Sequence, residues 1–113
     1  MSFRLYLLQR ATALFLTPMV VAHLAVIFYA TVQGLSAASV LARTRGSDLW
    51  GAFYGLFVFA AAIHGAIGVR NVLSEWGPRP LARNERALEA IMWLVALALG
   101  ALGFRAVYAL VIA

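Results

Sequence analysis

The amino-acid sequence predicts an all-α membrane protein with three transmembrane helices, its N-terminus in the cytoplasm and its C-terminus outside. Composition is the first observation behind this prediction. Hydrophobic residues make up 65% of the 113 residues, and the mean hydropathy is +0.92, whereas soluble domains usually contain about 45–50% apolar residues. A soluble fold of this size cannot bury so much apolar surface. The other two observations are the spacing of the charged residues and the distribution of the arginines.

Three long stretches between the charged residues are each long enough to cross the membrane. A helix needs roughly 20 residues to cross a hydrocarbon core about 30 Å thick. The predicted spans cover about residues 11–33, 49–72 and 88–111 within a single transmembrane anchor domain, residues 1–113. In the third span Arg105 lies near one end, where its long side chain can extend to the interface.

The connection between the second and third spans has the chemistry of a turn. Gly77 with the two prolines that follow predicts that the second helix ends after Trp76. We expect Asn84 to cap the third helix, with Glu85 in its first turn.

The arginines predict the orientation of the chain. All nine basic residues are arginines. Loops on the cytoplasmic side of membrane proteins carry an excess of positive charge. The N-terminus and the second loop therefore face the cytoplasm, because they hold six arginines: Arg4, Arg10, Arg70, Arg79, Arg83 and Arg86. The opposite side holds three: Arg43, Arg45 and Arg105.

Several kinds of chemistry are excluded by the residues that the chain lacks. There is no cysteine, which excludes disulfides, thiolate metal sites and covalent attachment of haem within this chain. No glycine-rich nucleotide loop and no carboxylate pair placed for acid–base catalysis is present. A soluble enzyme is therefore not expected.

Two histidines lie within the predicted spans, and an ionisable residue there is a functional candidate because its burial is costly. His64 has small residues on its own helical face, at Ala60, Ala61 and Gly68. Such a clearing allows a porphyrin to approach the helix. A second interpretation remains open, in which each histidine is neutral and bonds a hydroxyl of a neighbouring helix. His23 has bulkier neighbours, so its case as a ligand is weaker.

The two histidines are predicted at different depths. His64 lies about 9 Å from Arg70 along the helix, and His23 lies about 20 Å beyond Arg10. They are therefore not expected to bind the same iron. If both bind haem, there are two haems, and another chain supplies each second ligand.

The segment from His64 to Gly77 resembles the second-helix motif of the membrane anchors of succinate dehydrogenases and fumarate reductases. That motif is a haem-ligating histidine, a glycine four residues on, and an acid eleven residues on that is followed by an aromatic residue. This sequence has His64, Gly68, Glu75 and Trp76 at those offsets. The segment 9–13 (QRATA) also resembles the family's Arg-x-Thr/Ser-Gly/Ala start of the first helix.

The resemblance implies an anchor in the bacterial inner (cytoplasmic) membrane that binds a flavoprotein subunit, an iron–sulfur subunit and a second membrane anchor. It implies haem b, one or two per anchor pair, and a quinone as substrate. His64 would be an axial ligand of the haem iron beside Gly68, and His23 would be the ligand of a second haem. Arg10 would contact a haem propionate or the quinone.

Two further residues are implied at the quinone, Trp76 and Glu75. Trp76 stands where some family members have a tyrosine, and Glu75 replaces the commoner aspartate and is expected to hold Arg10 or Arg79. Gln9 also departs from the family's histidine at that position. Arg10 and Trp76 are equally common as anchors at the membrane interface.

Three other functions remain open for the sequence alone. The first is a haem-free anchor of the same class of complex, and the second is a structural or assembly subunit of another respiratory membrane complex. The third is a small proton-linked transporter subunit, although no Asp, Glu or Lys lies in the middle of a span.

Overall fold

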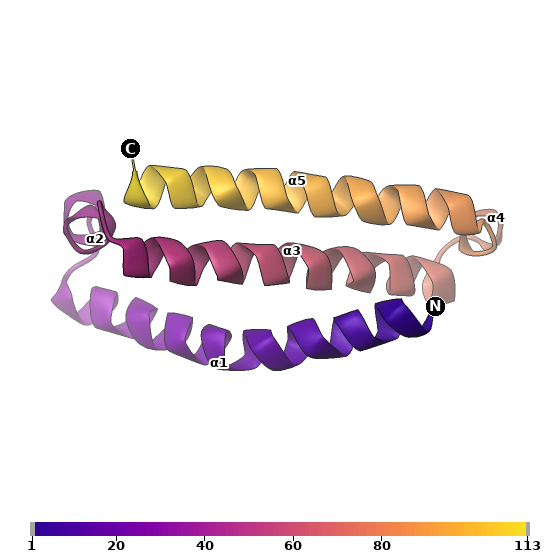
Figure 1. Ribbon diagram of the computed structural model, residues 1–113, viewed down its shortest axis with the longest axis horizontal. Coiled ribbons are helices and arrows are strands. Elements are labelled where there is room, and N and C mark those ends of the chain that lie inside the picture. The colour runs from indigo at the N-terminus through magenta and orange to yellow at the C-terminus, as the bar shows by residue number, and fades with distance from the viewer. Residues whose placement is uncertain (1, 113) are drawn as a thin grey trace.

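The computed structural model describes residues 2–112, which form helices and connections without any strand. Three helices are long and apolar enough to cross a membrane, as the composition predicts (Figure 1). Two short helices lie in the connections between them. The five helices are α1 (Phe3–Gln33), α2 (Ala37–Thr44), α3 (Asp48–Trp76), α4 (Arg79–Ala82) and α5 (Glu85–Val111).

Hydroxyl and amide side chains begin four of these helices. Ser2, Ser36, Ser47 and Asn84 each accept a hydrogen bond from a backbone N–H in the first turn. Such caps satisfy N–H groups that have no partner within the helix. The predicted cap at Asn84 is confirmed, as is the end of α3 at Trp76.

The long helices extend beyond the predicted spans. α1 has 31 residues, which corresponds to about 46 Å at the rise of an α-helix. The helix begins at Phe3 and includes Arg10, because a charged residue ends an apolar stretch without ending a helix. For the same reason the placement of Arg70 in the second loop is wrong. Arg70 lies within α3 and is buried.

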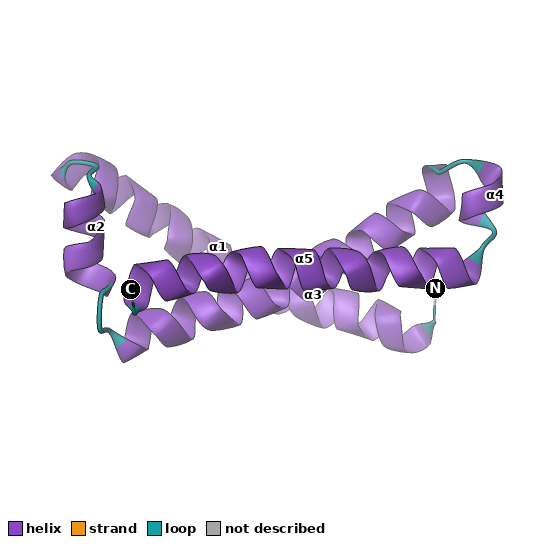
Figure 2. Cartoon of the chain, turned by 90° about the horizontal axis from the view of Figure 1, so that it is seen from above, coloured by secondary structure: helices purple, strands orange, loops and turns teal. Residues whose placement is uncertain are grey.

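α3 lies between α1 and α5, so that the three long helices are stacked in the order α1, α3, α5 (Figure 1). Seen from above, α1 and α3 cross near their middles (Figure 2). The packing of α3 against α5 is close because a glycine stands at the contact. A Cβ added at Gly103 would overlap the side chain of Val58.

The α1–α3 connection is tied to the end of α5. Thr44 donates a hydrogen bond from its hydroxyl to the carbonyl of Leu110, at 2.8 Å. The N–H of Gly46 donates to the carbonyl of Val111, at 2.7 Å. Gly46 has a positive φ of 74°, which favours glycine. These bonds satisfy carbonyls in the last turn of α5 that have no partner within the helix.

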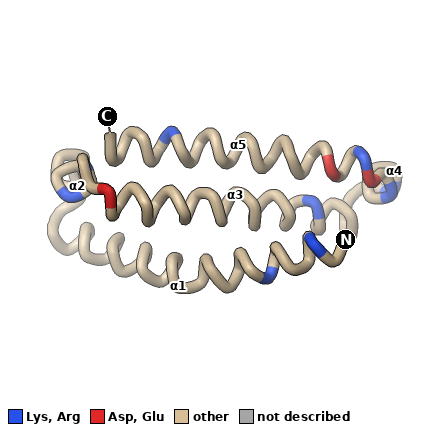
Figure 3. The backbone as a smooth tube through the Cα atoms, in the orientation of Figure 1, with Lys and Arg blue, Asp and Glu red and all other residues tan. Residues whose placement is uncertain are grey.

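The charged residues gather toward the two ends of the stack, and the middle is almost free of them (Figure 3). The start of α1 and the α3–α5 connection lie at the same end (Figure 1). Many large apolar side chains are exposed, among them Leu14 and Phe28. A bilayer accounts for both features, and the chain is a membrane protein. The assignment of the α1 start to the cytoplasm rests on the arginine count.

Candidate functional site

A threonine of α1 and a histidine of α3 meet where these two helices cross. Thr12 Oγ1 lies 3.1 Å from His64 Nδ1. The Thr12 side chain is buried, and His64 is half-buried. This contact is one of the few polar ones between long helices, and it fixes the orientation of the imidazole ring.

The other partners of Thr12 favour one tautomer of the His64 imidazole. Thr12 Oγ1 also lies 2.8 Å from the carbonyl oxygen of Leu8 and 3.0 Å from that of Gln9. Carbonyl oxygens only accept, so the single hydroxyl proton of Thr12 is directed to them. In the tautomer that this arrangement favours, Oγ1 accepts from His64 Nδ1–H. By this balance of donors and acceptors, the lone pair of the ring lies on Nε2.

His64 Nε2 is available to a group outside the chain. It makes no hydrogen bond to any residue among 2–112. It is also absent from the enclosed polar atoms that lack a partner, so it keeps accessible surface. Ala60 and Gly68, one turn to either side, offer little bulk beside the ring.

Gln9 lies one turn from this pair on α1, against Gly68 of α3. A Cβ added at Gly68 would meet Gln9 Nε2 at 3.6 Å. Gln9 Oε1 is buried and has no partner among the described residues. A buried acceptor without a partner is uncommon in proteins and calls for an explanation. The buried Gln9 side chain makes this level of the α1–α3 interface polar.

His23 forms a second contact at another level of the same interface. Its Nδ1 lies 3.4 Å from the hydroxyl of Tyr54, a long hydrogen bond. Its ring makes edge contacts with Tyr54 and Phe57, at centroid distances of 5.6 Å and 5.4 Å. Tyr54 and His64 are ten residues apart on α3, or about 15 Å along the helix axis. The two histidines therefore occupy separate sites.

The two histidines are not part of a larger cluster of metal-binding side chains among residues 2–112. Residues 2–112 contain no group of three His, Cys, Asp or Glu side chains that could hold a metal ion. Each histidine instead offers a single nitrogen at its own level. Such an arrangement suits an axial ligand whose counterpart comes from another chain.

No hydrogen bond or ion pair joins the side chains of the predicted quinone residues Arg10, Glu75 and Trp76 among residues 2–112. The Arg10 guanidinium lies over the ring of Tyr6, 5.4 Å from its centroid. Trp76 is 83% exposed, and Glu75 is exposed as well. The expected ion pair of Glu75 with Arg10 or Arg79 is wrong, since Glu75 has no such partner among residues 2–112.

The comparison with known protein families decides the identity of the chain. Residues 2–104 match the family described as succinate dehydrogenase/fumarate reductase transmembrane subunit. The chain belongs to this family. No curated protein and no solved structure matches it. As a membrane subunit of this class, it associates with other subunits of a succinate dehydrogenase or fumarate reductase.

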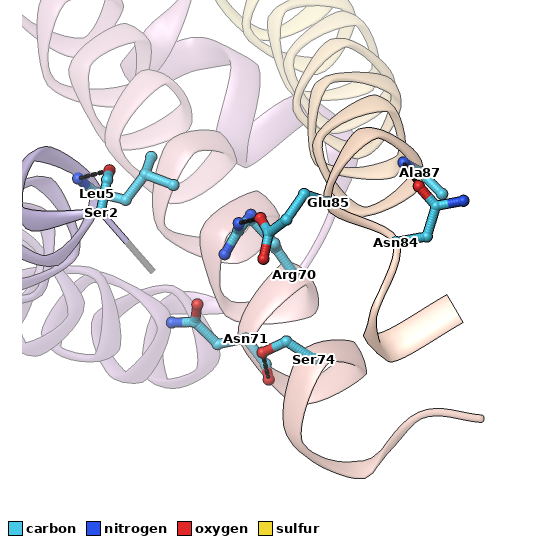
Figure 4. A network of polar contacts seen from close by, with 8 residues as sticks. All are labelled: Ser2, Leu5, Arg70, Asn71, Ser74, Asn84, Glu85 and Ala87. Atoms are coloured by element: carbon cyan, nitrogen blue, oxygen red, sulfur yellow. Dashed lines mark hydrogen bonds and ion pairs between the residues drawn. The ribbon is translucent and has the colours of Figure 1, made fainter. Parts of the chain in front are cut away.

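Sequence reasoning missed the principal ion pair of this transmembrane subunit. Arg70 of α3 donates from Nη2 to Glu85 Oε2 of α5, at 2.6 Å (Figure 4). The pair joins two helices through Arg70, which the sequence analysis assigned to the second loop, and Glu85, which it assigned to the first turn of the third helix. The one sequence feature that singles out Arg70 is its position six residues after His64. That spacing does not reveal which neighbouring helix the Arg70 side chain faces.

The hydroxyl partners of the histidines were also missed. Thr12 was noted only as part of a motif, and Tyr54 was not singled out. Helical spacing places Gln9 and Thr12 on one face of α1. It does not show that this face turns toward α3.

Proposed function

We propose that this transmembrane subunit binds haem b together with a second membrane anchor and helps to form a quinone site. In this role it carries electrons between the quinone and the flavoprotein and iron–sulfur subunits. It lies in the bacterial inner membrane with the start of α1 toward the cytoplasm. The hydrogen bond between Thr12 and His64 is the observation that carries the proposal.

His64 fits the requirements of an axial ligand. Histidines that bind metals almost always donate their other ring N–H to a nearby acceptor, which fixes the tautomer and raises the basicity of the ligand. Thr12 provides that acceptor at 3.1 Å and leaves Nε2 free. The haem would supply a one-electron redox centre. Ala60, Ala61 and Gly68 would let its ring approach α3.

The second axial ligand comes from the partner anchor in this proposal. His23 and His64 hold separate positions about 15 Å apart, because their contacts on α3 are ten residues apart. One chain therefore offers one nitrogen at each level. A pair of such anchors would complete each haem with a ligand from either side.

His23 is proposed as the ligand of a second haem. Its Nδ1 faces the Tyr54 hydroxyl, just as His64 faces Thr12. In both cases the hydroxyl comes from the opposite helix of the α1–α3 pair. This repeated arrangement supports a shared role, while the aromatic rings around His23 leave less space than the small residues around His64.

The quinone site is proposed near the start of α1, at Arg10, Glu75 and Trp76. Arg10 is an always-charged donor that suits a quinone carbonyl or a haem propionate. Trp76 can donate one hydrogen bond from its indole. Since no hydrogen bond joins Arg10 to Trp76 among residues 2–112, partner subunits would complete this site.

A proton-linked transporter is less well supported. Such a path needs a row of titratable side chains. The middle of the three long helices contains no Asp, Glu or Lys, and each of the two histidines there already has a hydroxyl partner. A haem-free anchor is the remaining alternative, and the following experiment distinguishes it from a haem-binding anchor.

The test is a dithionite-reduced minus oxidised absorption spectrum of the purified complex, with haem b quantified against this subunit. His64→Ala should abolish the b-type signal of its haem, and His23→Ala should remove about half of the total if two haems are present. Gln33→Ala, a polar change at the far end of α1, is the matched control. A wild-type complex without any b-type signal would overturn the proposal.

A further inference from the structure

A polar hollow and an apolar groove lie end to end on the face of α3 between α1 and α5. The hollow has a volume of about 710 Å³ and the groove about 600 Å³. Both are lined by Leu5, Met92 and Trp93, so they are continuous. Neither histidine lines them. The shape is that of a site for an amphiphile, with its head in the hollow and its chain in the groove.

The groove is apolar and has a floor of small residues. Ala62 and Ala66 of α3 and Gly100 and Ala101 of α5 line it, and no charged side chain does. A Cβ added at Gly100 would meet no atom within 4 Å. The groove is therefore open at Gly100, and its apolar lining suits an acyl chain.

The hollow carries charges of both signs in equal number. Arg4, Arg70, Glu85 and Glu89 all line it. Figure 4 shows Glu85 of α5 reaching to Arg70 of α3, with Ser2 and Leu5 of α1 beside them. Arg70 and Glu85 pair with each other, whereas Arg4 and Glu89 form no ion pair among residues 2–112. A purely anionic headgroup would meet two carboxylates, and a neutral quinone would leave Arg4 and Glu89 without a counterpart. A headgroup with one positive and one negative charge complements this remaining arginine and glutamate.

Arg70 has donors that no residue of the chain uses. It is 6% exposed, and its Nε–H is buried and has no partner among residues 2–112. The guanidinium bonds only Glu85, although it has several further N–H donors. A buried donor without a partner is costly. A phosphate oxygen in the hollow would be an acceptor for this side chain.

We infer that this hollow and groove bind a zwitterionic phospholipid whose headgroup carries a primary ammonium, of the phosphatidylethanolamine class. The phosphate lies toward Arg4 and Arg70, and the ammonium lies toward Glu85 and Glu89. A primary ammonium donates hydrogen bonds to carboxylates, whereas a quaternary choline has no N–H to donate. Trp93, at the junction, suits the level where headgroups meet acyl chains.

The experiment measures the phospholipid retained by the purified complex. The complex is reconstituted in nanodiscs with equal amounts of phosphatidylethanolamine, phosphatidylcholine and phosphatidylglycerol and then extracted into mild detergent. Bound lipid is quantified by mass spectrometry per mole of this chain. The wild-type complex should retain phosphatidylethanolamine in excess of the other two.

Two variants test the groove and the headgroup separately. Gly100→Leu should fill the groove and reduce the retained phosphatidylethanolamine to the level of the other lipids, while Ala98→Leu, on the opposite face of α5, should not. Glu89→Gln should lower the preference for ethanolamine over choline about threefold, as expected for one exposed charge pair. Asp48→Asn, at the other end of the stack, is its control.

The outcomes decide the inference in either direction. Preferential retention of phosphatidylglycerol, equal retention of all three lipids, or co-purified quinone that Gly100→Leu removes would each overturn it. If a partner subunit covers the hollow and the groove, Gly100→Leu will not change the amount of retained lipid. That result would also overturn the inference. The haem spectrum does not enter these results, so this test is independent of the proposed function.

Discussion

Replacing Thr12 with valine tests the contact on which the proposed haem site depends. Valine has nearly the shape of threonine and lacks the hydroxyl. The Thr12 side chain is buried against His64, so no water replaces the lost acceptor easily. His64 Nδ1–H is then left without its partner, and the ring loses the bond that fixes its tautomer.

The expected magnitude follows from the single bond removed. Leaving a buried donor without a partner costs about 1–3 kcal/mol. Loss of a partner behind a metal ligand typically lowers metal affinity by about 10–100-fold, which is roughly 1.4–2.8 kcal/mol. The two ranges agree. We expect Thr12→Val to weaken haem binding by about 10–100-fold without unfolding the subunit.

The assay is the transfer of haem from the purified complex to an excess of a haem-scavenging apoprotein, followed by absorbance. Thr12→Ser should behave as the wild type, because it keeps the hydroxyl. Thr17→Val is the matched control, since Thr17 bonds only the carbonyl of Ala13 in its own helix. If Thr12→Val retains haem as firmly as Thr17→Val does, the reasoning is refuted.

Two further predictions concern the stability of the helix stack. Gly103→Ala should lower the thermal midpoint of the detergent-solubilised complex, because the added methyl overpacks against Val58 at a cost of about 1–3 kcal/mol. Gly100→Ala should leave the midpoint unchanged, since its Cβ enters open space. Equal midpoints for the two variants would contradict the close α3–α5 packing. Glu85→Gln should destabilise the subunit by about 1 kcal/mol, because Arg70 is buried while Glu85 is 75% exposed to solvent screening. That loss should shrink at high salt, and a loss independent of salt would show that the pair does not act through charge.

Most of the fold could be predicted from the sequence, because the bilayer imposes simple requirements. A membrane span must satisfy its backbone hydrogen bonds internally, so each long uncharged stretch has to be a helix. The cap at Asn84 and the end of α3 at Trp76 followed from local chemistry in the same way. The helix ends were less accurate, and Arg70 was misplaced. An arginine can lie within a helix when a partner such as Glu85 pairs with it.

The candidate site was predictable only in part. His23 and His64 stand out because so few ionisable residues lie within the spans, and the spacing from His64 to Trp76 carries the family motif. The partners of these histidines were not predictable. Thr12 and Tyr54 are ordinary residues in apolar helices, and their roles arise from the way α1 and α3 cross.

That this chain is a helical membrane protein with three spans and two histidines at different depths follows from the amino-acid sequence alone. Apolar length, charge spacing and cap residues are local properties, so they can be read along the chain. The rotation and crossing of the helices, in contrast, are visible only in the three-dimensional arrangement. That crossing places Thr12 on His64 and Tyr54 on His23, and it pairs the buried Arg70 with Glu85. These contacts depend on side-chain packing between helices, which a one-dimensional pattern does not specify.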